Sequence, residues 1–155
     1  MADWSGEKIG FYEADKPYGC FSNLSPHPVL LDGYLWPTSE HYYQSRKFEE
    51  KEYQELILNL EDPIDAWRLT RKMADKVRPD WDMIKEAVMK KVLTAKALQH
   101  KSIWQTLRET GSMTLVEEAD DDPYWGTGED GKGKNRLGIL WMEVRDALPD
   151  TFEEG

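Results

Sequence analysis

A repeating apolar stripe after Asp80 is the sequence feature that most constrains the fold. Its members follow one another in steps of three and four residues: Trp81, Ile84, Val88, Val92 and Ala95. That spacing places the side chains on one face of a helix, which must be buried against other elements. Asp80 occupies the position of a helix-capping residue. The pattern therefore predicts a long amphipathic helix that begins after Asp80.

Capping residues and breakers predict further helices on both sides of this one. Thr38 directly follows Pro37 and is a candidate N-cap, and Asp62 precedes Pro63, which is well tolerated at a first helical position. Ser102 begins a capping-box pattern. The expected helix ends are Gly111 and Pro149. A final helix is expected between Asn135 and Pro149 because its apolar residues also recur at helical spacing.

Short extended runs predict a small sheet. The segments GFYEA and PVLLDGYLW are bounded by Gly and Pro, and Asp32-Gly33 is a strong hairpin-turn signal. MTLVEE is a further candidate strand. We expect one α+β domain over residues 1–155, mostly helical, with a small antiparallel sheet built largely from the first third. Its core should span about residues 10–148, with a loose acidic tail at 149–155.

The charge balance restricts the partners of the chain. Thirty acidic residues oppose twenty basic ones, which gives a formal net charge of -10. General nucleic-acid binding is disfavoured because a phosphate backbone is attracted to a basic surface. A few Lys or Arg side chains can still bind a single phosphate in an acidic protein. A small phosphorylated ligand is therefore compatible with the composition.

The residue inventory argues against several kinds of chemistry. Cys20 is the single cysteine, the opening MADWSGEK lacks a signal-peptide pattern, and the apolar runs are too short to cross a bilayer. These features predict a cytoplasmic protein. The histidines, at positions 27, 41 and 100, show no metal-ligand spacing. We expect no metal and no cofactor, which leaves chemistry based on carboxylates.

Glu40 is the first candidate for such chemistry. It lies in WPTSEHYYQSRKF, where a turn out of a strand places it in the first helical turn. Free amides and the helix dipole there favour an ionised carboxylate, which could stabilise developing positive charge. The alternative is a routine helix-start glutamate, and this segment alone favours that alternative. His41 points to another side of the helix and is expected to be a hydrogen-bonded core or rim residue.

A glycine-rich segment, EEADDDPYWGTGEDGKGKNRLG, is the second candidate region. Its amides could form an anion-binding nest beside Lys132, Lys134 or Arg136, with the following helix adding its positive end. It matches neither a phosphate-binding P-loop nor a dinucleotide fingerprint. A flexible surface loop explains the same composition equally well.

Together, several motifs resemble those of one known family. FYEADKPYGCFSN, LDGYLWPTSEHYYQSRKF, DWDMIKEAVMKKVL, TGSMTLVEEADDDPYWGTGEDGKGKNRLG and LWMEVRDAL occur in this order. The ordered set resembles the NADAR (NAD- and ADP-ribose-associated) family, and within it the YbiA-like N-glycosidases. The similarity runs from about Gly10 to Leu148.

The resemblance implies hydrolysis of a base–ribose N-glycosidic bond. For YbiA-like members it implies phosphoribosylamino-pyrimidine intermediates of riboflavin synthesis as substrates, with release of ribose 5-phosphate. Other family members resemble enzymes that remove ADP-ribose from guanine in DNA, and this alternative stays open. A non-catalytic nucleotide-binding module is a second alternative, which the carboxylate at Glu40 argues against.

The resemblance also implies a set of site residues. The catalytic positions of the family fall on Glu40, Trp81 and Asp122. Substrate-binding positions are expected at Ser22, Asn23, Lys47, Trp125, Gly126 and Asn135, with Lys132 and Lys134 receiving the phosphate. Thr70, where Gly is expected, and Ala97, where an aromatic residue is expected, depart from the family pattern. These two differences bear on pocket shape and hence on the base that is accepted.

Overall fold

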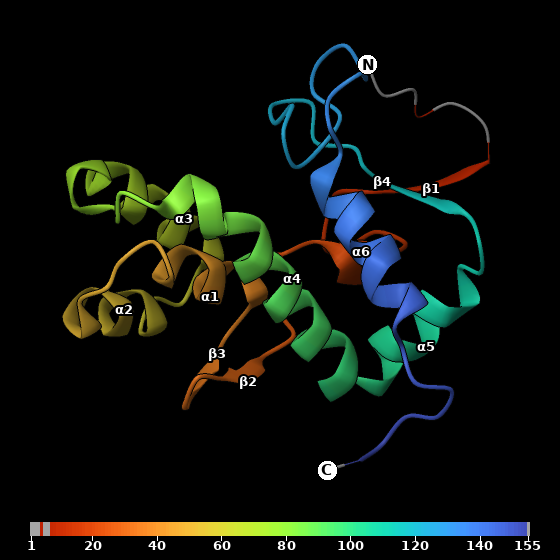
Figure 1. The fold of residues 1–155 in the computed structure, drawn as a ribbon, viewed down its shortest axis with the longest axis horizontal. Helices are drawn as coiled ribbons and strands as arrows, with labels where there is room; N and C mark the ends of the chain where they lie inside the picture. Colours follow the sequence, from red (N-terminus) through yellow and green to blue (C-terminus); the bar gives the residue numbers. More distant parts are fainter. Residues whose placement is uncertain (1–3, 5–6, 155) are drawn as a thin grey trace.

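The computed structural model describes residues 4 and 7–154 (Figure 1). Gly155 and most of the opening segment that was searched for a signal peptide lie outside the described residues. The elements are β1 (Lys8–Phe11), η1 (Gly19–Phe21), β2 (Val29–Leu31), β3 (Tyr34–Trp36), α1 (Ser39–Ser45), α2 (Lys51–Leu58), α3 (Pro63–Lys72), η2 (Ala74–Lys76), α4 (Trp81–Gln99), α5 (Lys101–Glu109), β4 (Thr114–Glu117) and α6 (Arg136–Asp146). The prediction of a mostly helical α+β fold is confirmed.

The long helix predicted after Asp80 is α4, and it lies at the centre of the fold (Figure 1). It packs against α1, α5, α6 and β2. Its most deeply buried side chains include Met89, Val92 and Leu93. The prediction that Asp80 caps α4 through its side chain is wrong, because the carboxylate of Asp80 instead accepts hydrogen bonds from the guanidinium of Arg78, at 2.6 and 3.1 Å.

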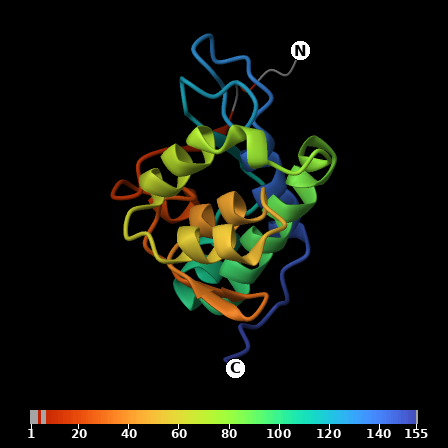
Figure 2. The same ribbon diagram turned by 90° about the vertical axis from the view of Figure 1, so that its left-hand side faces the viewer.

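The predicted hairpin is formed by β2 and β3. These strands pair antiparallel with Val29 opposite Trp36, and both side chains are fully buried. Asp32 and Gly33 form the turn with φ values of 53° and 87°, a left-handed conformation that tight hairpin turns require. Figure 2 shows this hairpin beneath α1, α2 and α3, so it supports the part of the chain that contains Glu40.

The second sheet differs from the prediction. β1 pairs with β4 in a parallel register that places Phe11 opposite Glu117. We expected the candidate strands to contribute to an antiparallel sheet. Parallel strands need a long connection, and here α1 to α5 provide it. This pairing brings the end of β1 beside the acidic segment that follows β4.

Two local predictions near the C-terminal half need correction. α5 begins at Lys101, so Ser102 lies inside the helix and is not its N-cap. The acidic tail, expected to be loose, contacts α5: the Pro149 carbonyl accepts hydrogen bonds from Trp104 and Arg108, and Phe152 packs edge-to-face on Trp104. The Phe152 ring therefore packs the tail against α5, and the acidic composition of the tail gave no indication of this contact.

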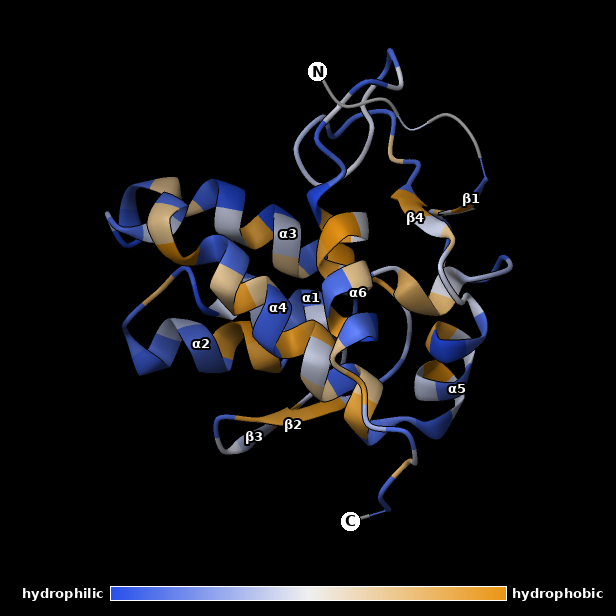
Figure 3. Ribbon diagram, turned by 45° about the vertical axis from the view of Figure 1, so that its right-hand side comes forward, coloured by the Kyte–Doolittle hydropathy of each residue, from blue (hydrophilic) through white to orange (hydrophobic). Residues whose placement is uncertain are grey.

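Most of the buried apolar side chains form one cluster around α4, α6 and the hairpin. Figure 3 shows the loop between β4 and α6 as largely hydrophilic, in contrast to the apolar segments of the helices beneath it. Across the described part of the chain, the helices are too short or too polar to cross a membrane.

Candidate active site

Glu40 is positioned by the start of α1. Thr38 is the N-cap, as predicted, and its hydroxyl accepts a hydrogen bond from the amide of His41 at 3.2 Å. The amide of Glu40 donates to the carbonyl of Asn23 at 3.1 Å, which ties the helix start to the loop after η1. The side chain of Glu40 lines a pocket of about 460 Å³. We call this cavity, with Glu40, Lys47, Arg71, Glu117 and Asp122 in its wall, the Glu40 pocket.

A chain of two hydrogen bonds orients the Glu40 carboxylate. Gln44, one helical turn later, donates from Nε2 to Glu40 Oε1 at 2.9 Å. The hydroxyl of Thr70 on α3 donates to Gln44 Oε1 at 2.8 Å. An ionised carboxylate only accepts hydrogen bonds, so the nitrogen end of the Gln44 amide faces Glu40 and the oxygen end faces the hydroxyl of Thr70. Thr70, which departs from the family pattern, therefore contributes to the site and does more than fill space.

Glu40 and Lys47 line the same pocket, and the charge of each affects the pKa of the other. Burial raises the pKa of Glu40, while the hydrogen bond from Gln44 and the positive charge of Lys47 act in the opposite direction. Burial lowers the pKa of Lys47, and the negative charge of Glu40 opposes this effect. Each group therefore favours the charged form of the other. The Lys47 Nζ also lies 5.8 Å from the ring centroid of Tyr43 and 5.9 Å from that of Trp81.

The segment after β4 supplies the opposite wall of the Glu40 pocket. Asp122 Oδ1 accepts hydrogen bonds from the amides of Tyr124 and Trp125, at 3.0 and 2.9 Å. The half-buried ring of Trp125 lies 5.7 Å from Tyr43, edge to face, and lines the pocket. Asp122 and Trp125 line the same pocket as Glu40. Their proposed catalytic and binding roles stay predictions.

A polar clamp fixes this segment against α4. The guanidinium of Arg136 donates to both carboxylate oxygens of Glu86, at 2.8 and 2.6 Å, and the hydroxyl of Tyr124 donates to the same carboxylate. Lys85 Nζ lies 4.0 Å from the ring centroid of Tyr124. Because Tyr124 precedes Trp125 directly, the clamp limits the positions available to the Trp125 ring.

The loop after η1 brings Ser22 and Asn23 into the Glu40 pocket. The Asn23 side chain accepts from Ser39 Oγ at 2.8 Å and donates to Met89 Sδ at 3.4 Å. Beneath this loop, the fully buried Lys96 donates to Ser22 O at 2.9 Å and Ser25 Oγ at 2.8 Å. Burial lowers the pKa of Lys96 to about 7. This lysine supports the loop from the side opposite the cavity.

Other residues expected in the site lie behind it or away from it. Trp81 is buried and packs edge-to-face on Tyr43, 5.1 Å away, so it supports the wall that contains Tyr43 and Lys47. Asn135 is fully buried, and its side chain binds the backbone of β4 at Leu115 and Glu117. Lys132 and Lys134 are exposed and lie outside the Glu40 pocket.

The glycine-rich loop uses its own amides internally. The amides of Gly126, Gly133 and Lys134 donate to carbonyls at Asp122, Thr127 and Pro123, at 3.1, 2.6 and 2.8 Å. The Lys132 amide donates to Asp130 Oδ1 at 2.9 Å. These bonds occupy donors that the expected anion nest would need. The prediction that Lys132 and Lys134 bind phosphate through their side chains remains a prediction.

Sequence reasoning missed one face of α3. Ile64, Trp67 and Arg71 recur at intervals of three and four residues and all line the Glu40 pocket. The Arg71 guanidinium lies 4.3 Å from the Trp67 ring centroid, and Trp67 is 42% exposed. The spacing of these residues was the available signal, since it predicts a shared helical face. Trp67 and Arg71 thus form an exposed rim of the Glu40 pocket, with an aromatic ring and a positive charge on one helix face.

Sequence reasoning also missed Glu117. It lies in the acidic run EEADDD, yet its side chain lines the Glu40 pocket. Burial, followed by the negative charges of Asp122, Glu40 and Asp121, raises its pKa to about 8. Its position as an alternate residue of a candidate strand was the only signal that it faces inward.

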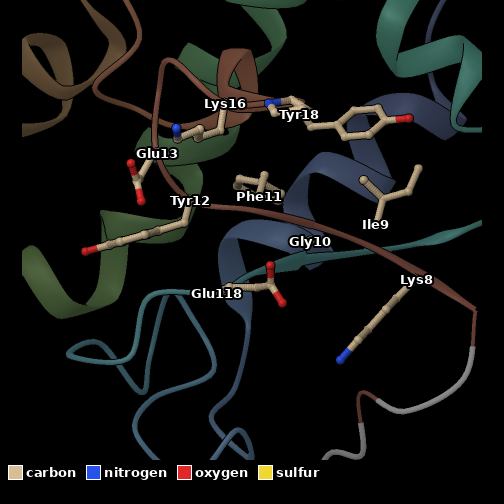
Figure 4. Close-up of a pocket in the computed structure, with 10 residues that line it drawn as sticks. Lys8, Ile9, Gly10, Phe11, Tyr12, Glu13, Lys16, Tyr18 and Glu118 are labelled. Carbon is tan, nitrogen blue, oxygen red and sulfur yellow. The ribbon is translucent and has the colours of Figure 1, made fainter.

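A second hollow, of about 610 Å³, lies along β1 and the loop that follows it (Figure 4). Its charged side chains include Lys8, Glu13, Lys16 and Glu118. Tyr12 lines both cavities. Although this hollow is larger, it lacks Glu40 and Lys47 and the cluster of carboxylates around them. We therefore assign the candidate active site to the Glu40 pocket.

Among residues 4 and 7–154, the His, Cys, Asp and Glu side chains form no group of three that could hold a metal ion. The carboxylates of the Glu40 pocket are accompanied by Lys47 and Arg71, an arrangement suited to a polar organic ligand with an anionic group.

Comparisons with known proteins agree with the motif order. The family model described as the NADAR domain matches residues 10–149. N-glycosidase YbiA of Escherichia coli is 45% identical over 140 residues, covering 90% of this chain and 88% of that protein. A Vibrio vulnificus riboflavin biosynthesis protein is 39% identical, and the match covers 93% of this chain but 39% of that longer protein.

The fold has a solved counterpart. The NMR structure of the E. coli protein YbiA matches with a TM-score of 0.84 and 44% sequence identity, covering 90% of this chain and 83% of that one. The residues matched by the family model, 10–149, include every residue that lines the Glu40 pocket. The chain belongs to the NADAR family.

Proposed function

We propose that this protein is an N-glycosidase that hydrolyses the bond between a ribose and a nitrogen base. The observation that carries the proposal is the Glu40 carboxylate, which lines a pocket and is oriented there by Gln44 at 2.9 Å. Relatives named as N-glycosidases support the reaction class.

Glu40 suits the transition state of this reaction. Ribosyl transfer to water develops positive charge on the ribose, and a fixed carboxylate stabilises that charge or orients the attacking water. Gln44 and Lys47 favour the ionised form that this role requires, while burial makes the carboxylate a stronger base. Glu40 thus combines a negative charge with the basicity to accept a proton from water.

We further propose a phosphoribosylamino-pyrimidine of riboflavin synthesis as the substrate, with ribose 5-phosphate as a product. Trp125 offers a ring for stacking on the base, and Arg71 with Lys47 offers positive charge for the phosphate. The names of the Vibrio vulnificus protein and of a chloroplastic Zea mays relative support an association with riboflavin synthesis. The net charge of -10 weighs against a DNA-linked ADP-ribose substrate.

A direct assay tests the proposal. The purified protein is incubated separately with the phosphoribosylamino-pyrimidine and with ADP-ribosylated guanosine, and released sugar and base are quantified. We expect turnover of the first substrate, unchanged after dialysis against a chelator. Turnover of the second substrate alone would indicate the ADP-ribose alternative. Tight binding of either compound without release of sugar would indicate a binding module.

A further inference from the structure

The backbone of Glu117 is held on both sides, which fixes the direction of its side chain. Its amide donates to Asn135 Oδ1 at 2.8 Å, and its carbonyl accepts from the amide of Thr127 at 3.0 Å. It is also the last residue of β4, opposite Phe11 in the parallel pair. A side chain on such a rigid support can place a functional group accurately. That group is a carboxyl within the Glu40 pocket.

The Glu117 carboxyl differs from its neighbours in its hydrogen bonding. Glu40 Oε1 is occupied by Gln44, and Asp122 Oδ1 by two backbone amides. Glu117 Oε2 is buried and has no hydrogen-bond partner within residues 4 and 7–154. A buried polar atom without a partner is uncommon in folded proteins and calls for an explanation, such as a catalytic role. Because this oxygen has almost no accessible surface, nothing compensates its burial and the protonated form of the carboxyl is favoured, while the side chain as a whole lines the pocket.

The surroundings of Glu117 favour its neutral form. Burial is the largest cause, and the carboxylates of Asp122, Glu40 and Asp121 follow, so that its pKa rises to about 8. The other titratable or charged groups of the pocket wall are Tyr12 after β1, Tyr43 on α1, Lys47 just after α1, and Arg71 on α3. Around neutral pH the carboxyl therefore retains a proton that it can donate.

We infer that Glu117 is the proton donor to the leaving base. This inference rests on the proposed N-glycosidase function and deepens it. Glu40 and Glu117 lie in one pocket, so a ribosyl compound can contact both. Asp122, a catalytic position that the family resemblance implies, uses Oδ1 to hold the turn that places Trp125.

The bond between C1′ of the ribose and the nitrogen of the base breaks, and its electron pair stays on the nitrogen. That nitrogen takes the proton of Glu117. Water forms the new bond to C1′ and gives its proton to Glu40. Proton exchange with solvent then restores the acid form of Glu117 and the carboxylate of Glu40, as in general acid–base catalysis of glycoside cleavage.

The first test compares pH profiles of kcat/KM for the phosphoribosylamino-pyrimidine. Wild-type activity should fall as the pH rises above about 8, because Glu117 loses its proton there. Glu117→Gln keeps the shape but transfers no proton, so it should lose roughly a hundredfold or more of activity and this alkaline decline. Glu118→Gln is the matched control, since the adjacent side chain lines the other hollow (Figure 4). A Glu117→Gln profile like that of the wild type would overturn the inference.

The second test varies the leaving group. In 4-nitrophenyl ribofuranoside 5-phosphate, the nitrophenolate leaves without a proton. Glu117→Gln should therefore cleave this compound at nearly the wild-type rate, while Glu40→Gln should be impaired on both compounds. An equal loss for Glu117→Gln on both would remove the proton-donor role. Absence of sugar release by the wild type from either compound would instead overturn the proposed function, so the two failures are distinguishable.

A third variant tests the inference even if Glu117→Gln does not fold. Glu117→Asp keeps the acid but shortens its reach by one methylene group. It should be slower than the wild type on the phosphoribosylamino-pyrimidine and retain the alkaline decline. Thermal unfolding of each variant is measured alongside. A folded Glu117→Asp protein without any alkaline decline would contradict the assignment even if Glu117→Gln fails to fold.

Discussion

The side-chain amide of Gln44 donates to Glu40 Oε1 at 2.9 Å, one turn further along α1. Both residues face the same cavity, and the opposite end of the Gln44 amide is held by Thr70 on α3. The orientation of the candidate catalytic carboxylate thus depends on contact between two helices. The charge of the Glu40 carboxylate and its orientation can therefore be tested by separate variants.

Glu40→Gln removes the charge and nearly preserves the size of the side chain. If the charge stabilises the transition state, kcat should fall by roughly two to three powers of ten while the substrate still binds. A helix-start role would instead cost only a few tenths of a kcal/mol in stability. Single-turnover sugar release, substrate affinity and thermal unfolding on the same variant separate the two roles. Wild-type turnover with slightly reduced stability would exclude Glu40 from the chemistry.

Thr70→Val removes the hydroxyl that holds Gln44 and retains a similar shape. A neutral hydrogen bond contributes roughly 0.5–1.5 kcal/mol, so we expect kcat to fall by about tenfold or less, with KM nearly unchanged. Thr70→Ser keeps the hydroxyl and is the control that should restore the rate. If both variants lose the same activity, packing rather than the hydrogen bond to Gln44 is responsible.

Two regions are candidates for binding the phosphate of the substrate: the Glu40 pocket at Arg71, and the glycine-rich loop at Lys132 and Lys134. Arg71→Ala should raise KM about tenfold for the 5′-phosphorylated substrate and have little effect on its dephosphorylated counterpart, because an exposed ion pair contributes on the order of 1 kcal/mol. Lys132→Ala and Lys134→Ala should show the same selectivity if the glycine-rich loop binds the phosphate. Comparing both forms of the substrate across the three variants identifies the region. Equal effects on both forms at Arg71 would place the phosphate elsewhere.

The buried Lys96 predicts a pH dependence of stability. Its pKa is about 7 in the folded protein, against about 10.4 for an unperturbed lysine. Between these values the unfolded chain binds a proton that the folded protein does not. The free energy of unfolding should therefore rise with pH across this window, with a contribution of at most about 1.4 kcal/mol per pH unit.

Lys96→Met tests that dependence because it removes the amine and retains the length of the side chain. Ser22 and Ser25 lose a hydrogen-bond donor at every pH, whereas only the wild type should show the added slope. Denaturant unfolding from pH 7 to pH 10 gives the comparison. Parallel curves for the two proteins would mean that Lys96 keeps its charge in the folded state.

Local chemistry was sufficient to locate several elements from the sequence. The Thr38 cap, the Asp32-Gly33 turn and the Asp62 cap each depend on contacts within a few residues, and the structure contains all three. Glu40 accordingly lies in the first turn of α1, as predicted. Such features are readable because the interacting atoms are neighbours along the chain. The cap predicted at Asp80 failed for a related reason, since Arg78 offers the same carboxylate a stronger, charged partner.

Tertiary packing alone decided what surrounds Glu40. The parallel pairing of β1 with β4 brings Glu117 into the pocket, and α3 contributes Thr70 and Arg71. Apart from its place in a candidate strand, Glu117 carried no signal of burial, because an acidic composition does not show which distant segments cover a residue. The sequence by itself determined the helices, the hairpin and the position of Glu40. The acidic wall, the Thr70–Gln44 contact and the buried Lys96 exist only because distant segments pack together, and their altered pKa values follow from that burial.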